Sequence, residues 1–366
     1  MDHEIRFPER LRDSMAAGHG IMITPNHPRM ADPMVFMYVA REIPCNFYAM
    51  ASWHLFNQDW FTTTVIRMMG AFSVNREGLD KAAIDYAIKI LQNAERPLLI
   101  FPEGSTSRTN DQLMALMDGP AFIARTAAKR RAKEGKKVVI HPVGLKYLYN
   151  GDIEKSCDEV LTDLEHKLSW KPQRELPLID RIIKFGNAML KLKELEFDAP
   201  TVQGSLRERQ NSLRNHLLGP LEEEWLGSVK EGGVQVRVKN LRMKIFPEMT
   251  RQELSDEERA RRWRHLERTY LAQQVDCYPE QYLVEVPSVD RILETCEKFE
   301  EDLTDKARIH GDLKVIIEIG EAIEVSPERV RGVTEDPIMA SVRGSLEEML
   351  GRLQNESRIY QSPSSA

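Results

Sequence analysis

Short apolar runs alternate with helical patterns over residues 15–150, and this alternation is the feature that most constrains the fold. The apolar runs lie at 20–24, 97–101 and 138–145, and helical periodicity separates them. Strands that are apolar along their whole length are typical of parallel sheets buried on both faces. The pattern therefore predicts an α/β fold, with a mixed, mainly parallel sheet flanked by helices.

The middle of the chain has a different character, with charged and helical patterns over 157–305. Ser255 and Glu258 have the spacing of a capping box, which predicts a helix running to about Gln274. The strand pattern returns at 313–325, and an amphipathic helix follows at 335–354.

This order predicts one α/β domain that is interrupted and then completed. We expect its first part at 1–155, a mostly helical insertion between late strands at 156–310, the closing strand and helix at 311–356, and a disordered tail at 357–366.

Composition excludes several classes of protein. The formal net charge of −6 argues against general nucleic-acid binding. Residues 1–155 hold 20 basic and 17 acidic side chains and the remainder 31 and 40, so the first part would tolerate an anionic surface better. The 4 cysteines form no CxxC pair, which argues against a zinc ribbon or a disulfide scaffold and favours a reducing cytoplasm. We find no signal peptide and no apolar run of the roughly 18–20 residues that a membrane span needs.

The first candidate motif is Asn26-His27 with Asp32 five residues further on. His27 follows a predicted strand, so it would lie at the carboxyl edge of the sheet, where ligands bind in open α/β folds. An Asp carboxylate on one imidazole nitrogen would leave the other nitrogen as a general base. Such a pair also occurs by chance, and alone it identifies nothing.

Two further motifs follow predicted strands. A strand at 72–74 leads to Arg76, a side chain suited to bidentate phosphate recognition, although an ion pair with a neighbouring acid is the simpler interpretation. The apolar run at 97–101 leads into the segment Phe101-Pro102-Glu103-Gly104-Ser105-Thr106-Ser107-Arg108, where Gly104 permits close approach of a ligand to the backbone. A fourth motif places His141 and Pro142 within an apolar strand; we expect a structural histidine there, and an edge or a bulge at the proline.

Together, in this order, the motifs resemble the four sequence blocks of the glycerolipid acyltransferase family, which includes the 1-acylglycerol-3-phosphate acyltransferases. Asn26, His27 and Asp32 match its NHxxxxD block, and Arg76 ends the second block. Phe101 to Thr106 match the FPEG block, and the strand with Pro142 matches the fourth. The resemblance covers residues 15–150 and the closing segment.

The resemblance implies transfer of a fatty acyl group from acyl-CoA or acyl carrier protein to the hydroxyl of 1-acylglycerol-3-phosphate. His27, oriented by Asp32, would be the general base, with no metal and no cofactor. Substrate contacts would come from Asn26, Arg76, Phe101, Pro102, Glu103, Gly104, Ser105, Thr106 and Arg108.

Three departures leave alternatives open: Thr106 stands where many members have Arg, an N-terminal anchor is missing, and the insertion is unusual. The acceptor could be glycerol-3-phosphate or another lysophospholipid, or the chain could be a non-catalytic lipid-binding scaffold. We expect a cytoplasmic protein in peripheral contact with the inner face of the membrane. Its candidate surface is the basic cluster Lys129, Arg130, Arg131, Lys133, Lys136 and Lys137, which could instead receive an acidic carrier protein or be a solvated helix end.

Overall fold

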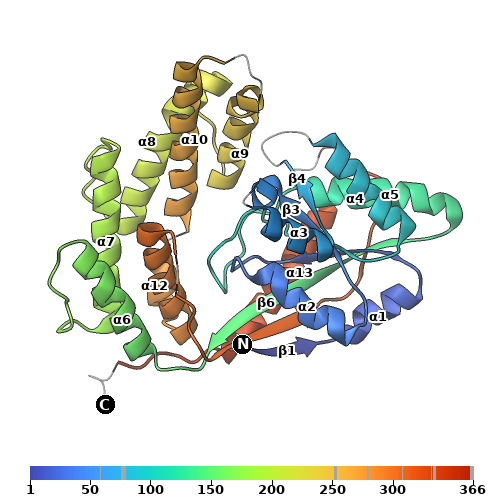
Figure 1. Cartoon of the computed structure of the whole chain (residues 1–366), viewed down its shortest axis with the longest axis horizontal. Coiled ribbons are helices and arrows are strands. Elements are labelled where there is room, and N and C mark those ends of the chain that lie inside the picture. The colour runs from blue at the N-terminus through green and yellow to red at the C-terminus, as the bar shows by residue number, and fades with distance from the viewer. Residues whose placement is uncertain are drawn as a thin grey trace. The chain divides into compact units, whose positions relative to one another are not determined.

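The computed structural model describes residues 1–57, 59–75, 80–250, 254–277, 280–306, 308–330, 332 and 335–362. The chain divides into two compact units (Figure 1). The first, here the α/β unit, comprises Met1–Leu148 and Asp312–Glu356. The second, the helical unit, comprises Tyr149–Gly311 and the chain from Ser357 onward. The limits of the two units are 148/149, 311/312 and 356/357, and the sequence-based boundaries are 155, 310 and 356.

The α/β unit is built on a sheet of 8 strands, ordered β1-β7-β6-β2-β5-β3-β4, with β8 paired to β6. The strands are β1 (Asp2–Arg6), β2 (Gly20–Pro25), β3 (Tyr48–Ser52), β4 (Ala71–Val74), β5 (Leu98–Leu99), β6 (Val138–Tyr149), β7 (Leu313–Ile319) and β8 (Ile323–Glu324). The pairs β1–β7, β2–β6, β2–β5, β3–β5 and β3–β4 are parallel, and β6–β8 is antiparallel. The predicted mixed, mainly parallel sheet is confirmed.

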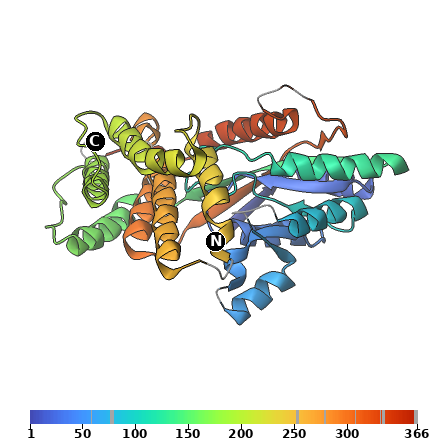
Figure 2. The same cartoon turned by 90° about the horizontal axis from the view of Figure 1, so that it is seen from above.

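Helices cover both faces of this sheet (Figure 2). They are α1 (Pro8–Ala16), α2 (Asp32–Glu42), α3 (Trp60–Met68), α4 (Lys81–Asn93), α5 (Gly119–Arg131) and α13 (Pro337–Leu353), with 3₁₀ turns η1 (Trp53–Asn57), η2 (Ala132–Glu134) and η4 (Gln354–Glu356). Side chains of α4, α5 and α13 pack with Val138 and Ile140 on one face. Those of α1 and α2 pack with Val139, Val143 and Tyr147 on the other. Because strand side chains alternate between faces, the odd-numbered residues of β6 belong to the α1–α2 side.

Two elements at the N-terminus, β1 and α1, are absent from the sequence-based prediction. The strand β1 pairs in register with β7, from Asp2 beside Lys314 to Arg6 beside Glu318. Its charged side chains are neutralised across the sheet, since Lys314 Nζ lies 2.6 Å from Glu4 Oε2. A charged strand carries no local hydrophobic pattern, so only its partner more than 300 residues away identifies it.

The prediction that Pro142 marks an edge or a bulge is wrong, because β6 lies inside the sheet between β7 and β2. A proline lacks the N–H that a central strand would donate. Here the Pro142 carbonyl accepts from Gly320 N at 2.8 Å, at the point where β7 has ended at Ile319 and β8 has not begun. The N–H and the carbonyl of one strand residue point to the same neighbouring strand. The position of the missing Pro142 N–H therefore faces the gap between β7 and β8, where no acceptor of a continuous strand is left without its donor.

The helical unit confirms the mostly helical insertion between late strands. Its helices are α6 (Ile153–Lys167), α7 (Leu178–Glu196), α8 (Leu206–Leu226), α9 (Val234–Ile245), α10 (Asp256–Asp276), α11 (Glu280–Glu285) and α12 (Val289–Thr304), with the 3₁₀ turn η3 (Pro247–Thr250). At the predicted start of α10, Ser255 Oγ accepts from Glu258 N at 3.2 Å. The Glu258 carboxylate accepts from Arg261 and Arg262, so the Ser255 half of the expected capping box is the one that forms.

Residues 357–362, expected in a disordered tail, lie against the helical unit. The Arg358 carbonyl accepts from Val289 N, and Tyr360 N donates to the Pro287 carbonyl, both at 2.8 Å. The tail therefore adds backbone hydrogen bonds to this unit, and residues 363–366 lie outside the described ones.

Candidate active site

The candidate site lies at the carboxyl edge of the sheet, where loops leave the parallel strands β2 and β5. His27 follows β2, and Phe101 and Glu103 follow β5, which pairs with β2 at Ile23 and Leu99. Parallel pairing brings both loops to the same edge. Ser107 N donates to the His27 carbonyl at 2.8 Å and joins the two loops directly.

His27 and Asp32 form a hydrogen-bonded pair, with 2.8 Å between Nδ1 and Oδ2. The imidazole is 15% exposed and the carboxylate is fully buried. An ionised carboxylate only accepts, so the proton of a neutral imidazole sits on Nδ1. The lone pair is then on Nε2, which can accept a proton because the hydrogen bond to Asp32 uses Nδ1.

Asp32 is held by more than its histidine. Its Oδ2 also accepts from Arg29 N at 2.9 Å, and its Oδ1 accepts from Tyr147 Oη at 2.6 Å. Asp32 is also the first residue of α2, where the positive end of the helix favours a negative charge. Both carboxylate oxygens therefore have fixed partners, and the charge is compensated without solvent.

The imidazole ring is fixed by packing as well as by hydrogen bonding. Phe101 stacks on His27 with ring centroids 4.0 Å apart and an angle of 27° between the planes. Phe36 of α2 packs edge-on against Phe101, with the two ring centroids 6.4 Å apart. The ring of His27 is therefore confined to one orientation.

Glu103 holds two loops together through backbone donors. Its Oε1 accepts from His27 N at 2.6 Å and its Oε2 from Met114 N at 2.9 Å. The side chain is only 2% exposed, and burial raises the pKa of this carboxyl to about 7 against the lowering effect of both backbone donors. The Asp32 charge raises the pKa further, whereas Arg343 lowers it. Glu103 thus fixes the backbone of the histidine itself.

Asn26 has a similar fixing role, which differs from the predicted substrate contact. Its amide accepts from Leu145 N at 2.7 Å and donates to the Leu145 carbonyl at 3.0 Å. Asn110 does the same two residues further along β6, with Tyr147 N at 2.9 Å and the Tyr147 carbonyl at 2.6 Å. These two amides attach the β2 and β5 loops to β6.

Comparison with known proteins shows what the segment that carries these motifs is similar to. Residues 4–146 match the model of the Acyltransferase family. The chain is also 36% identical over 110 residues to the 1-acyl-sn-glycerol-3-phosphate acyltransferase of Streptococcus pneumoniae. That alignment covers 30% of this chain and 38% of the relative. The resemblance inferred from the four motifs is confirmed for this segment, which is similar to an acyltransferase domain and is called the acyltransferase domain below.

The rest of the FPEG segment of the acyltransferase domain forms the loop beside His27. Gly104 has a φ of 73°, a left-handed conformation that favours glycine, and Met117 Sδ fills the space where a Cβ would lie. The Pro102 carbonyl accepts from Met117 N at 2.8 Å. Thr106 Oγ1 donates to Met30 Sδ at 3.2 Å, and Arg108 has a left-handed φ of 56°. Ser105 and Thr106 are half-buried, so this loop keeps part of its hydroxyl surface in solvent.

Arg76, predicted to hold a phosphate, lies outside the described residues. The neighbouring Asn75 is described, and its N–H donates to Asp80 Oδ2 at 3.0 Å. Asp80 also caps α4 through Ala83 N at 3.0 Å. Residues 75 and 80 are therefore held near each other at the end of β4.

His141 has the structural environment that the sequence suggested. Its Nδ1 donates to the Gly320 carbonyl and its Nε2 meets Ser14 Oγ, each at 2.9 Å. Burial lowers the pKa of this imidazole, which favours the neutral ring that these two partners need.

The structure corrects the membership of the basic cluster at 129–137. Arg131 is buried, and its guanidinium donates to the carbonyls of Gly18, Gln92 and Lys137. Lys136 and Lys137 pair with Glu134 and Glu324. These contacts reduce the positive surface that was expected there.

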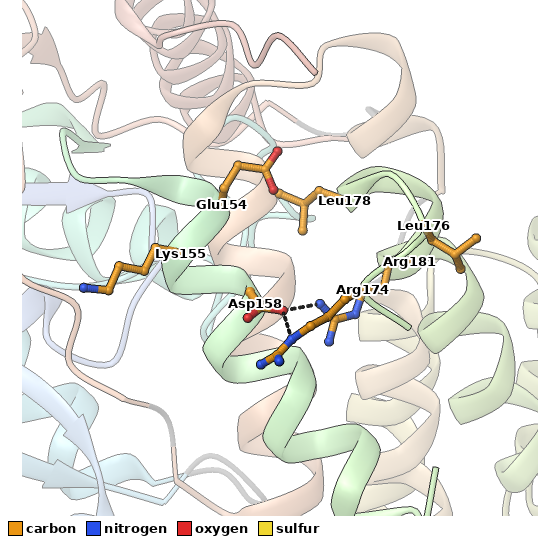
Figure 3. A pocket seen from close by; sticks show the side chains of 7 residues that line it. All are labelled: Glu154, Lys155, Asp158, Arg174, Leu176, Leu178 and Arg181. Atoms are coloured by element: carbon orange, nitrogen blue, oxygen red, sulfur yellow. Dashed lines mark hydrogen bonds and ion pairs between the residues drawn. The ribbon is translucent and has the colours of Figure 1, made fainter. Parts of the chain in front are cut away.

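A pocket of about 370 Å³ lies in the helical unit, and its lining residues, all within 154–181, belong to none of the predicted motifs. Figure 3 shows Asp158 between the guanidinium groups of Arg174 and Arg181. Arg181 is also bonded at both Nε and Nη2 to Glu165. The chemistry inferred from the sequence is therefore not in this pocket.

Tyr147 is the site residue that sequence reasoning missed. The predicted strand ended at Leu145, whereas β6 continues to Tyr149. Alternation along β6 was the available signal, since Leu145 and Tyr147 share the face that carries α2.

Proposed function

We propose that this chain is an acyltransferase that moves a fatty acyl group from a thioester donor to the hydroxyl of 1-acylglycerol-3-phosphate. The observation that carries the proposal is the His27–Asp32 pair, 2.8 Å apart in the matched domain, with the other imidazole nitrogen left for a substrate. The acceptor class comes from the name of the Streptococcus relative.

In the proposed reaction His27 Nε2 takes the proton of the acceptor hydroxyl. The hydroxyl oxygen attacks the thioester carbonyl carbon, and the tetrahedral intermediate expels the thiolate as the C–S bond breaks. The proton held by His27 passes to the thiolate, which returns the imidazole to its neutral form. Asp32 stabilises the imidazolium formed on the way, and no covalent acyl-enzyme is needed.

The acceptor would lie along the FPEG loop, near Ser105, Thr106 and Arg108, with Arg76 as the proposed phosphate partner. Asn26 and Glu103 are satisfied by backbone groups, so we assign them to positioning of the loop. Phe101 packs on the base, and Pro102 and Gly104 set the path of the turn.

The donor is acyl-CoA or acyl carrier protein, both of which present the same thioester. Glycerol-3-phosphate or another lysophospholipid is the alternative acceptor. With either alternative acceptor, His27 remains the base and the same bonds form and break; only the molecule in the acceptor site differs.

Peripheral contact with a membrane belongs to this proposal, because the acceptor is an amphiphile. Within the described residues, every helix is too short or too polar to cross a bilayer. The short helix α3 instead exposes apolar side chains: Trp60 is 79%, Phe61 64% and Met68 83% exposed. Aromatic side chains of this kind bind at the interface of a bilayer.

A non-catalytic scaffold is the second candidate function. It would keep the fold without needing a polarised imidazole. The His27–Asp32 pair favours the enzyme, because the imidazole is 15% exposed while the carboxylate that orients it is fully buried.

The test measures thiol release from acyl-CoA with lysophosphatidic acid, glycerol-3-phosphate or no acceptor, in the presence of vesicles. We expect acceptor-dependent release by the wild type and a loss of at least about 100-fold in His27→Ala. The matched control is His166→Ala, an exposed histidine of α6. Full activity in a folded His27→Ala protein would refute the mechanism. A wild type that is inactive with both acyl-CoA and acyl carrier protein would favour the scaffold.

A further inference from the structure

The buried end of β6 supplies the dyad with a third side chain. Tyr147 Oη donates to Asp32 Oδ1 at 2.6 Å, while Asp32 Oδ2 receives His27 Nδ1 at 2.8 Å. The phenol is 1% exposed and the carboxylate 0%, so water does not compete for either group. A hydrogen bond from a neutral donor to a buried carboxylate is among the stronger kinds in proteins.

The backbone around Tyr147 is fixed independently of its hydroxyl group. The Asn110 amide bonds both its N–H and its carbonyl, and the side chain belongs to the apolar cluster with Leu145 and Val143. The guanidinium of Arg29 lies over the ring, 5.1 Å from its centroid. The hydroxyl group is thus delivered to Asp32 by a rigid strand.

We propose that Tyr147 is a positioning residue of the proposed acyl transfer, forming a Tyr147–Asp32–His27 chain in which the phenol fixes the carboxylate that orients the base. This proposal rests on the proposed function for its kinetic test. Tyr147 does not reach the substrate, and its effect passes through Asp32.

The phenol also moderates the charge that reaches the imidazole. The hydrogen bond draws negative charge toward Oδ1, which leaves less of it on the oxygen that faces His27. The other charged or titratable groups around the dyad are Arg29, whose N–H bonds Asp32, and Glu103, which bonds the His27 backbone and is itself influenced by Arg343. The donor that the structure shows on Asp32 Oδ1 is the Tyr147 phenol.

Tyr147→Phe removes the hydroxyl group and keeps the buried ring. We expect kcat to fall by about 10- to 100-fold, the range that loss of one hydrogen bond to a charged group gives, with KM nearly unchanged. We also expect the acid limb of the pH–rate profile to move to higher pH, because the imidazolium gains a less screened carboxylate.

The matched control is Tyr149→Phe, two residues along the same strand. The Tyr149 hydroxyl is bonded to Ser156 Oγ at 2.6 Å in the helical unit, and its loss should leave kcat and the pH profile as in the wild type. Circular dichroism and thermal unfolding of both variants separate a general loss of stability from a local effect.

An NMR titration of the His27 ring keeps the proposal testable if no substrate is found. We expect its midpoint to lie at higher pH in Tyr147→Phe than in the wild type, whether or not acyl transfer is detected. An unchanged midpoint, or an unchanged kcat and pH profile in an active enzyme, would overturn the role of Tyr147. Wild-type inactivity combined with a shifted midpoint would refute the acyl transfer alone.

Discussion

At the scale of single residues, the candidate site is a set of buried polar groups that fix one another. Asp32 has three donors, and Glu103 has two backbone donors from separate loops. The side chains of Asp32, Glu103 and Tyr147 are buried, and that of His27 is 15% exposed. Such networks are stable when every member is satisfied, and they are sensitive to the loss of any one.

Glu103 gives a pH-dependent prediction, because its folded pKa of about 7 lies above the ordinary value of 4.5. The folded state binds this proton more tightly, so the favourable contribution is complete below pH 4.5 and is lost as pH rises through 7. Glu103→Gln cannot lose a proton. Between pH 5 and 8 the stability of the wild type should therefore fall relative to the variant, by up to about 3 kcal/mol.

Urea unfolding of both proteins at several pH values checks this prediction. The useful quantity is the difference in free energy of unfolding, since other groups titrate equally in the two proteins. A difference that is flat with pH would show that Glu103 is ionised throughout.

At the scale of elements, successive helices of the helical unit are joined by buried ion pairs. Arg181 of α7 bonds Glu165 of α6, Arg209 of α8 bonds Glu194 of α7, and Arg237 of α9 bonds Glu222 of α8. Each pair is bidentate, with separations of 16, 15 and 15 residues. The pairs fix which helix packs beside which, a role that apolar contacts perform less selectively.

The Arg237–Glu222 pair is suited to a double-mutant cycle, since its side chains are 8% and 0% exposed. Arg237→Met leaves a buried carboxylate unpaired and should destabilise the protein by about 3–5 kcal/mol. Adding Glu222→Leu should recover much of that loss, because no buried charge remains. Additive losses from the two substitutions, measured by urea unfolding, would show that the pair is not coupled.

At the scale of the whole molecule, the net charge of each unit differs from that of a continuous stretch of sequence, because the α/β unit combines two separate segments. The basic excess of residues 1–155 suggested a surface suited to anionic lipid. The α/β unit also includes Asp312–Glu356, and with this segment it holds 24 basic and 25 acidic side chains. Net charge therefore no longer singles out this unit, and apolar exposure on α3 is the better argument for membrane contact.

Membrane contact through α3 predicts that Trp60→Ser with Phe61→Ser weakens binding to vesicles of mixed neutral and anionic lipid. The loss should persist at high salt, because it removes apolar contact and leaves the charges unchanged. Trp263→Ser is the control, since Trp263 is 55% exposed on α10 of the helical unit. Cosedimentation measures the binding. Equal losses in both variants, or salt-sensitive binding that only charge reversal at Lys129 and Lys133 abolishes, would contradict this contact.

Local patterns were enough to predict much of the fold and part of the site. The apolar strands, the amphipathic helix expected over 335–354 and the insertion follow from periodicity, and His27 with Asp32 follows from their spacing after a strand. The strand β1 and the ion pairs of the helical unit depend on partners far along the chain, which no window of sequence contains.

The sequence by itself determined that one edge of the sheet carries His27, Asp32 and Glu103, because all three come shortly after the ends of apolar strands. Only the tertiary structure decided what these side chains do. In the folded chain Glu103 and Asn26 bond backbone groups, and Tyr147 bonds Asp32, which is 115 residues away in the sequence. The reason is physical: burial obliges every polar group to find a partner, and the partner is chosen by the packing of strands and not by their order.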